Sequence, residues 1–272
     1  LPILFEKSFY FGLDLAASYT FGHSKSVYDG TSSVAYSNWK YNYAVDSNNP
    51  GLAYSMFDIP HRVMVSVGYR TPRYAKGFMA TTVSLVYNGY VGQRYSLTMN
   101  ESYYDAEKKK TVYIDYNGDG WGGNSLLYIP TEDELQKMDF KTEEDRRKFD
   151  EWIEGDSYAK KHRGAYAMRN SNSAPWENRV DLHVAQDIFV LKDRGSKFQV
   201  TFDVTNFANM LNKKWGTTYT AAYNVMPLQV IGSKKGEDGN YTNTYAYNSR
   251  NTITKNDVLS RWHAQIGIKY IF

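Results

Sequence analysis

Residues 198–206 read Phe-Gln-Val-Thr-Phe-Asp-Val-Thr-Asn, so large apolar side chains alternate with polar ones. A period of two places the apolar side chains on one face of a β-strand and the polar side chains on the other. The end of the chain, residues 261–272, repeats the alternation as Arg-Trp-His-Ala-Gln-Ile-Gly-Ile-Lys-Tyr-Ile-Phe. Both stretches therefore predict strands with one apolar and one polar face.

Four further segments, each of about ten residues or more, alternate in the same way. A tilted strand of about 9–11 residues is long enough to cross a bilayer. The sequence therefore predicts six strands, at about 8–20, 58–70, 78–88, 176–190, 198–206 and 260–272.

The connections between these segments alternate in length. Two are short and rich in turn-forming residues: 71–77 with Pro72 and Gly77, and 191–197 with Asp193, Arg194 and Gly195. Three are long: about 21–57, 89–175 and 207–259. Short turns at one end and long loops at the other are typical of an outer-membrane barrel. We therefore predict an all-β fold, a transmembrane antiparallel up-and-down β-barrel with long external loops.

Composition excludes several other classes of protein. The 272 residues include 32 basic and 29 acidic side chains, and the net charge of +3 is too even for an electrostatic nucleic-acid binder. The lack of cysteine excludes a disulfide framework, a thiolate zinc site and a cysteine nucleophile. No run approaches the roughly 18 apolar residues of a membrane helix, and the sequence does not begin with the basic-then-apolar pattern of a signal peptide.

A soluble β-sandwich is the main alternative, because its strands alternate too. Its connections are usually short, so a connection of about 80 residues argues against it. Tyrosine and tryptophan lie near the predicted strand ends, as in interfacial girdles: Tyr19, Tyr69, Tyr87, Trp176, Trp262 and Tyr270. The polar faces carry charges that suit a polar lumen: Asp14, Arg62, Arg70, Arg179, Asp181, Asp187, Asp203, Arg261 and Lys269.

Six strands are too few for a closed barrel, since the smallest single-chain barrels have about eight. An open sheet would leave two edges of unsatisfied backbone groups in lipid. The sequence also begins abruptly at Leu1-Pro2, beside a predicted strand. We therefore expect residues 1–272 to be the C-terminal part of a single, larger barrel, the rest of which lies upstream or in another chain.

Several motifs resemble those of a known family. They are Ser37-Asn38-Trp39, Pro60-His61-Arg62, Asp115-Tyr-Asn-Gly-Asp-Gly120, Leu127-Tyr-Ile-Pro130, Val204-Thr-Asn-Phe-Ala-Asn-Met-Leu-Asn-Lys-Lys-Trp-Gly216 and the terminal strand that ends in Phe272. In that order they resemble the C-terminal part of TonB-dependent outer-membrane transporters. The chain is most similar to the Oar-like group, which has a carboxypeptidase-regulatory-like N-terminal domain and is related to SusC-like importers.

The resemblance implies a 22-stranded barrel, of which these would be the last six strands, with an N-terminal plug and a TonB box that are absent from this sequence. It implies active import of a nutrient, such as a glycan or a peptide, by way of the TonB complex. It also implies that the barrel-assembly machinery reads the closing strand, with Ile268, Tyr270 and Phe272 as the terminal signal. The lipid membrane, and a surface lipoprotein that acts as a lid, are further expected partners.

Two other functions stay open at this stage. One is a passive or structural outer-membrane barrel, such as a porin, an adhesin or a component of a surface complex. The other is a soluble β-rich binding module.

The loop 115–120 resembles the start of a calcium-binding loop. Asp115, Asn117 and Asp119 supply oxygen atoms at positions 1, 3 and 5, and Gly120 follows at position 6. The bidentate glutamate expected at position 12 is replaced by Leu126. The alternative is a loop of Asx-turns that is stabilised by its own side-chain hydrogen bonds.

Residues 131–152 depart from the β pattern. Thr131-Glu-Asp-Glu134 forms a capping-box motif, and Thr142 is a second candidate N-cap. The sequence therefore predicts one or two short amphipathic helices within the longest loop. Their apolar edge, which includes Phe149 and Trp152, packs on neighbouring loops or forms a docking site for a substrate or a lid protein.

The first and third long loops are rich in aromatic residues, which together with asparagine, serine and glycine make adaptable surfaces for glycans or peptides. Packing between loops is the alternative role for most of them. No enzyme site is expected, because the five histidines are scattered and the sequence has no nucleophile elbow, P-loop or HExxH motif. The polar-face pairs Arg179/Asp181 and Asp181/His183 are interpreted as wall charges of the lumen or contacts of the plug.

Overall fold

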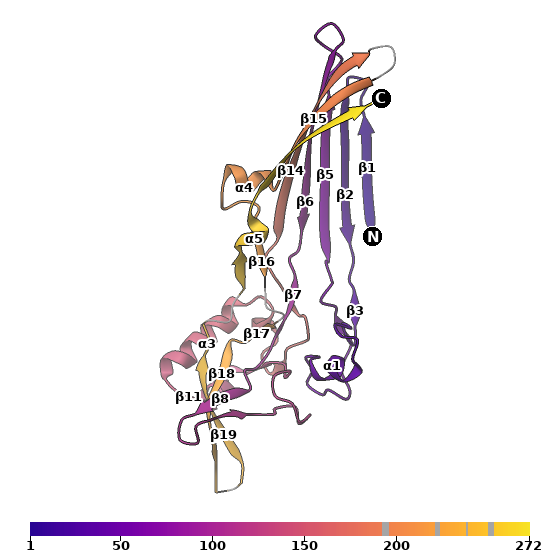
Figure 1. Ribbon diagram of the computed structural model, residues 1–272. Helices are drawn as coiled ribbons and strands as arrows, with labels where there is room; N and C mark the ends of the chain where they lie inside the picture. The colour runs from indigo at the N-terminus through magenta and orange to yellow at the C-terminus, as the bar shows by residue number, and fades with distance from the viewer. Residues whose placement is uncertain (192–195, 221–223, 238, 250–252) are drawn as a thin grey trace.

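The computed structural model describes residues 1–191, 196–220, 224–237, 239–249 and 253–272, and its largest sheet is antiparallel with seven strands (Figure 1). In spatial order the strands are β1 (Pro2–Ser8), β2 (Leu13–Phe21), β5 (His61–Arg70), β6 (Met79–Tyr90), β14 (Glu177–Leu191), β15 (Ser196–Thr205) and β21 (His263–Ile271). The spatial order of these seven strands is also their order along the chain, which is an up-and-down arrangement. The short connections lie at one end, called the turn end, and the long ones at the other, called the loop end.

The strand register aligns the apolar residues that the sequence predicted to share a face. Val67 of β5 lies opposite Leu15 of β2 and Leu85 of β6. The row continues through Leu182 of β14 to Val204 of β15. Because cross-strand neighbours point to the same side, this face of the sheet is apolar across β2, β5, β6, β14 and β15, whereas the partner of Leu15 on the edge strand β1 is Lys7.

The opposite face, called the wall face, is polar, and several of its charges pair with one another. Asp187 of β14 is 2% exposed and lies at the turn end. One of its oxygens accepts hydrogen bonds from Arg70 at 2.9 Å and from Lys197 at 2.6 Å, so the carboxylate joins three strands. Arg179 and Asp181 form a second pair at 3.3 Å. At these positions each charged side chain of the wall face is therefore paired with a side chain of opposite charge.

Within the described residues, the large sheet has one strand more than the six that we predicted, and the first predicted strand, 8–20, is wrong at its start. Residues 9–12 form a turn between β1 and β2, in which Phe9 N–H donates to the Leu13 carbonyl at 2.8 Å. Gly12 has φ +93°, and a Cβ there would lie 2.2 Å from the Arg70 carbonyl oxygen. The alternation runs through this turn because Phe9 and Phe11 are apolar. The conformation that only glycine adopts easily is what separates the two strands.

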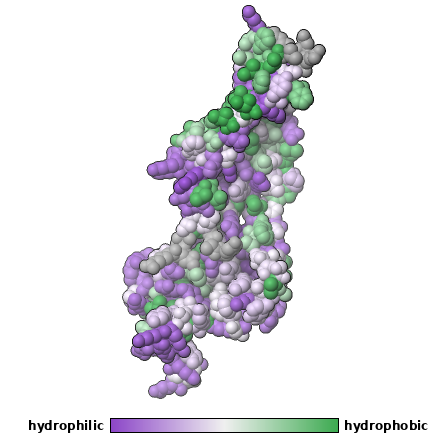
Figure 2. Space-filling model, in the orientation of Figure 1, coloured by the Kyte–Doolittle hydropathy of each residue, from purple (hydrophilic) through white to green (hydrophobic). Residues whose placement is uncertain are grey.

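The predicted turn at Asp193, Arg194 and Gly195 lies outside the described residues. The predicted girdle residues fall near both ends of the strands: Tyr69 and Tyr270 at the turn end, and Tyr19, Tyr87, Trp176 and Trp262 at the loop end. Figure 2 shows apolar residues gathered mainly toward the turn end, whereas the loop end is largely hydrophilic. Within the described residues, no helix has the length and apolar character needed to cross a membrane.

The three long connections contain short elements. The first has β3 (Lys25–Ser26), α1 (Ala35–Lys40) and β4 (Ala53–Tyr54). The second has β7 (Arg94–Leu97), β8 (Ser102–Asp105), β9 (Lys110–Tyr113), β10 (Tyr128–Ile129), α2 (Glu132–Lys137), β11 (Asp139–Phe140), α3 (Glu143–Gly155), η1 (Ala159–Lys161), β12 (Ala165–Tyr166) and β13 (Asn172–Ser173). The third has α4 (Phe207–Leu211), β16 (Thr218–Thr220), β17 (Asn224–Val225), β18 (Leu228–Lys235), β19 (Tyr241–Tyr247), β20 (Thr254–Asn256) and α5 (Asp257–Ser260).

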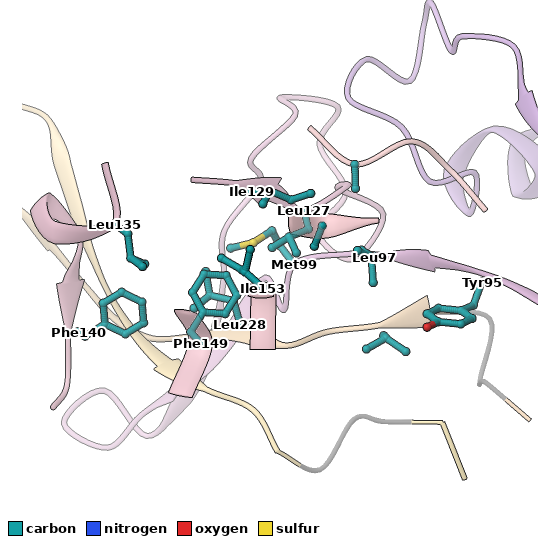
Figure 3. Packing of buried hydrophobic residues seen from close by; sticks show 13 residues of the cluster. Tyr95, Leu97, Met99, Leu127, Ile129, Leu135, Phe140, Phe149, Ile153 and Leu228 are labelled. Atoms are coloured by element: carbon teal, nitrogen blue, oxygen red, sulfur yellow. The ribbon is translucent and has the colours of Figure 1, made fainter. Parts of the chain in front are cut away.

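These connections fold together into one packed unit at the loop end, called the loop body. Thirteen buried apolar residues form its core, and they come from the second and third connections (Figure 3). Leu97, Leu127, Ile129, Phe149 and Ile153 have no exposed surface. The largest apolar core of the described residues therefore lies in the loops and not in the sheet.

Both predicted helices are present. The Thr131 hydroxyl accepts a hydrogen bond from the Glu134 N–H and so caps α2. The Glu134 carboxylate accepts one from the Thr131 N–H, which completes the capping box. Thr142 caps α3. Phe149 and Ile153 of α3 are fully buried, so the interpretation that this apolar edge packs on neighbouring loops is confirmed for these two residues.

Candidate functional site

A buried ion pair ties the first connection to the second. Asp58 is 2% exposed and lies just before β5, and Arg94 at the start of β7 is 8% exposed. The Nε and Nη2 atoms of Arg94 donate to Asp58 Oδ2 at 3.0 and 2.8 Å. The other oxygen, Oδ1, accepts from the Ser24 N–H at 2.6 Å. This pair anchors the first connection to the rest of the loop body.

The surroundings of Asp58 keep it ionised. Burial by itself would raise its pKa, but the Ser24 N–H, the Arg94 guanidinium and His23 outweigh burial and lower the pKa below the ordinary value of 3.8. Hydrogen bonds to the charged form and a nearby opposite charge both favour ionisation.

A second buried guanidinium lies close by, on Arg169. It donates to the Ser26 carbonyl and to the Asn42 side chain, and it lies 3.8 Å from the Asp29 carboxylate. Asn170 follows with φ 54° and donates to Asp29 at 3.0 Å. Residues that are far apart in sequence therefore meet in one hydrogen-bonded cluster.

The two guanidinium groups border a cavity of about 330 Å³ between the first and second connections, called the polar cavity. Its lining includes Asp29, Asn38, Tyr41, Asn42, Arg94 and Arg169. Each arginine is already paired with a carboxylate, so the lining is close to neutral. Amide groups, a phenol ring and paired charges suit a ligand that is polar and rich in hydroxyl or amide groups.

Aromatic residues of the first connection flank this cavity. Lys40 of α1 places its ammonium 3.3 Å from the centre of the Trp121 ring, and Tyr41 meets Trp121 edge-on. Tyr41 is 59% exposed. The aromatic surface that the sequence predicted for this connection therefore has both packed and accessible members.

The predicted calcium residues lie together in the loop 115–120, where they accept hydrogen bonds from the protein. Asp115 accepts from the N–H groups of Asp119 at 3.2 Å and Gly120 at 2.7 Å. Asp119 accepts from Ser47 and Asn124. These bonds match the Asx-turn interpretation and attach the loop to the first connection. No group of three or more acidic or histidine side chains suited to a metal occurs in the described part of the chain, and calcium binding stays a prediction.

One buried carboxylate was not singled out by the sequence reasoning. Glu101 is 3% exposed and accepts hydrogen bonds from the backbone N–H groups of Gly123, Ser125 and Tyr116. Burial raises its pKa above the usual value and these bonds oppose the rise only in part. Its neighbours in sequence are polar, so no pattern distinguishes Glu101 from an exposed residue.

The predicted terminal signal lies on β21. Ile268 and Tyr270 share the apolar face and pair with Val200 and Phe198 of β15. Phe272 is 96% exposed. The role of these residues in barrel assembly stays a prediction.

The family model of the outer membrane beta barrel domain matches residues 1–261. The chain belongs to this family. A search of curated proteins and a search of solved structures each find no match. This outer-membrane barrel domain therefore places its apolar face toward lipid, and the loop body extends from the end of the membrane-spanning sheet.

A charge on the lipid-facing side of the barrel domain should destabilise it. Leu85 lies in the middle of β6 and is 40% exposed, so Leu85→Arg is expected to cost about 2–4 kcal/mol, as an arginine near the midplane does. The measurement is urea unfolding of the protein in lipid vesicles. Ser84→Arg, on the wall face of the same strand, is the matched control and should cost less. Equal losses for the two variants would contradict the assignment of the faces.

Acid should loosen the first connection of the barrel domain. Because Asp58 has a lowered pKa when folded, its stabilising contribution is fully present above the ordinary value of 3.8 and is lost as the pH falls through the lower folded value. Protease cleavage within residues 22–60 is therefore expected to accelerate below about pH 4. Asp58→Asn should remove this part of the pH dependence, and an unchanged slope in that variant would refute the assignment.

Proposed function

We propose that the protein imports a nutrient across the outer membrane, with the sheet as part of the barrel wall and the loop body as the substrate-binding vestibule. The observation that carries this proposal is the packed core of the loop body together with the polar cavity beside it. A channel that only allows diffusion has no need of a separately packed unit with buried, fully paired polar clusters above the wall.

The finer proposal is that import is TonB-dependent. It is supported by the resemblance of the motifs to Oar-like and SusC-like transporters. The two sheet edges, β1 and β21, each pair with one strand in the described residues and would need further partners in lipid, which supports a barrel larger than this sheet. On this proposal the sheet belongs to a 22-stranded barrel that contains a plug, and the wall face contacts that plug.

We further propose that the protein works with three partners and has no catalytic role. The TonB complex supplies energy, the barrel-assembly machinery reads Ile268, Tyr270 and Phe272, and a surface lipoprotein covers the vestibule. We propose no enzymatic role, since the histidines stay dispersed: His183 pairs with Asp203 on the wall face, whereas His23 lies beside Asp58.

The test compares three bacterial strains: one with the protein, one without it and one without TonB. Each strain receives a defined mixture of short peptides and a mixture of oligosaccharides, and mass spectrometry measures what is removed from the medium. We expect removal of one class only where both the protein and TonB are present. Removal that needs the protein but not TonB would establish a passive barrel instead. Equal removal with and without the protein would refute import of both classes.

A further inference from the structure

A second cavity in the loop body has a different chemistry. It encloses about 290 Å³ and is lined by Tyr116, Tyr128, Tyr166 and Tyr245, together with Met99 and Glu134. We call it the tyrosine cavity. It joins the second and third connections, because Tyr245 comes from β19 whereas the other five residues come from the second connection.

Two of the tyrosine rings of this cavity meet edge to face. The rings of Tyr128 and Tyr166 are 5.1 Å apart at an interplanar angle of 65°. Tyr166 is 52% exposed and marks the mouth. Tyr116 lies deeper, where burial raises its pKa strongly, so its phenol stays neutral. The cavity lining therefore combines an exposed aromatic side chain, Tyr166, with a more buried one, Tyr116.

The only charged side chain of the cavity lining is negative. Glu134 accepts hydrogen bonds from the Thr131 N–H at 2.9 Å and from the Tyr128 hydroxyl at 2.9 Å. These bonds lower its pKa, so the carboxylate is ionised. The flanking segment 131–156 carries eleven acidic and five basic residues, although the whole chain has a net charge of +3. The negative charge of Glu134 in the lining therefore favours a cation over an anion.

Other aromatic clusters in the loop body already hold a cation of the protein itself. Lys40 lies over Trp121, and the Arg94 guanidinium lies 4.2 Å from the centre of the Tyr54 ring. Within the described residues, by contrast, no lysine or arginine lies over the four tyrosine rings of the tyrosine cavity. Cations of the described residues thus leave the faces of these four rings unused.

We propose that the tyrosine cavity binds an organic cation, an ammonium or guanidinium group of the kind that ends a lysine or arginine side chain, as part of the imported substrate. This inference rests on the proposed import function. Tyrosine faces attract a cation through the ring quadrupole, and more strongly where water is excluded. The Glu134 carboxylate supplies the opposite charge, and the Met99 thioether adds a polarisable contact. A neutral sugar could donate hydrogen bonds to that carboxylate, but it would lack the attraction between opposite charges and the attraction of a cation to the tyrosine faces.

The test uses choline and its neutral carbon isostere, 3,3-dimethylbutan-1-ol, as probes. Their binding to the intact protein, purified from outer membranes in detergent, is measured by ligand-observed NMR. Choline is expected to bind about 2- to 30-fold more tightly than the isostere, which is the range of a cation–π contact from exposed to desolvated sites. Equal binding of the two probes, or no binding of choline, would overturn the proposal.

Three variants locate the site. Glu134→Gln removes the charge and keeps the capping box, because glutamine also serves at that position. Tyr166→Leu removes an exposed aromatic face without opening the core. Both are expected to reduce the preference for choline by at least half, whereas Glu132→Gln, the same charge change in the first turn of α2 outside the cavity, should leave it unchanged. Loss in the control variant as well would show that only the general acidic field matters and would refute the site.

The outcome is separable from that of the proposed function. Choline binding is measured without an energy source, so a protein that binds choline but fails to import any substrate would refute import and keep the cation site. A protein that imports a neutral substrate and shows no preference for choline would refute the cation site alone.

Discussion

Replacing Asp58 by asparagine is expected to destabilise the loop body by about 3–5 kcal/mol. Arg94 would keep its charge in a place where only 8% of its surface meets water, and an unpaired buried charge carries a penalty of this size. The first connection should detach from the second, while the strands stay paired. The measurement is denaturant unfolding followed by protease cleavage within residues 22–60, in lipid vesicles.

Two comparisons make this result specific. Asp46→Asn changes the same group at an exposed position of the same connection, keeps the Asx hydrogen bond to Asn48, and should have little effect. The double variant Asp58→Asn/Arg94→Met removes both charges and should lose less stability than the sum of the two single variants. Additive losses would mean that the pair does not act as a unit.

Truncating Phe149 to alanine is the second change with a large expected effect. Its ring has no exposed surface, lies parallel to Trp152 with centroids 6.0 Å apart, and meets Phe140 at 6.1 Å. Deleting a buried phenyl group removes its transfer free energy and leaves a cavity, which together cost about 3–5 kcal/mol. Tryptophan fluorescence should report earlier unfolding of the loop body, whereas the amount of folded barrel should not change.

The neighbouring position supplies the control. Lys148 is one residue away on α3 and points to solvent, so Lys148→Ala should change stability by less than about 0.5 kcal/mol. Phe149→Leu should fall between the two, since it retains part of the apolar volume. If Phe149→Ala unfolded the sheet and the loop body together, the loop body would not be an independent packing unit.

The strands could be predicted because their signal is local. Alternation in 198–206 is visible in nine residues, and the register in the sheet places Val200 and Phe202 opposite Ile268 and Ile266, as one shared face requires. Strand β1 escaped prediction because Leu1–Glu6 is nearly all apolar apart from its last residue and so does not alternate. A period-two test finds strands with two different faces and misses strands without them.

The loop body and its cavities depend on contacts between distant residues. Asp58 and Arg94 are separated by 36 positions, and Asn170 lies 141 positions from Asp29. No spacing rule links such residues, so the polar cavity could not be predicted, whereas the loop 115–120 and the capping box of α2 could. The core of α3 is intermediate: its apolar edge was visible in the sequence, but its partners on the third connection were not.

The pairing of β6 with β14 continues over twelve residue pairs, on either side of the longest connection. The register of these strands is therefore set by their own side chains and is independent of how many residues lie between them. Loop closure also becomes only slowly more costly with length. The sheet and the loop body are thus modular. The loop body can be exchanged, enlarged or rebuilt in evolution while the membrane-spanning sheet is inherited unchanged.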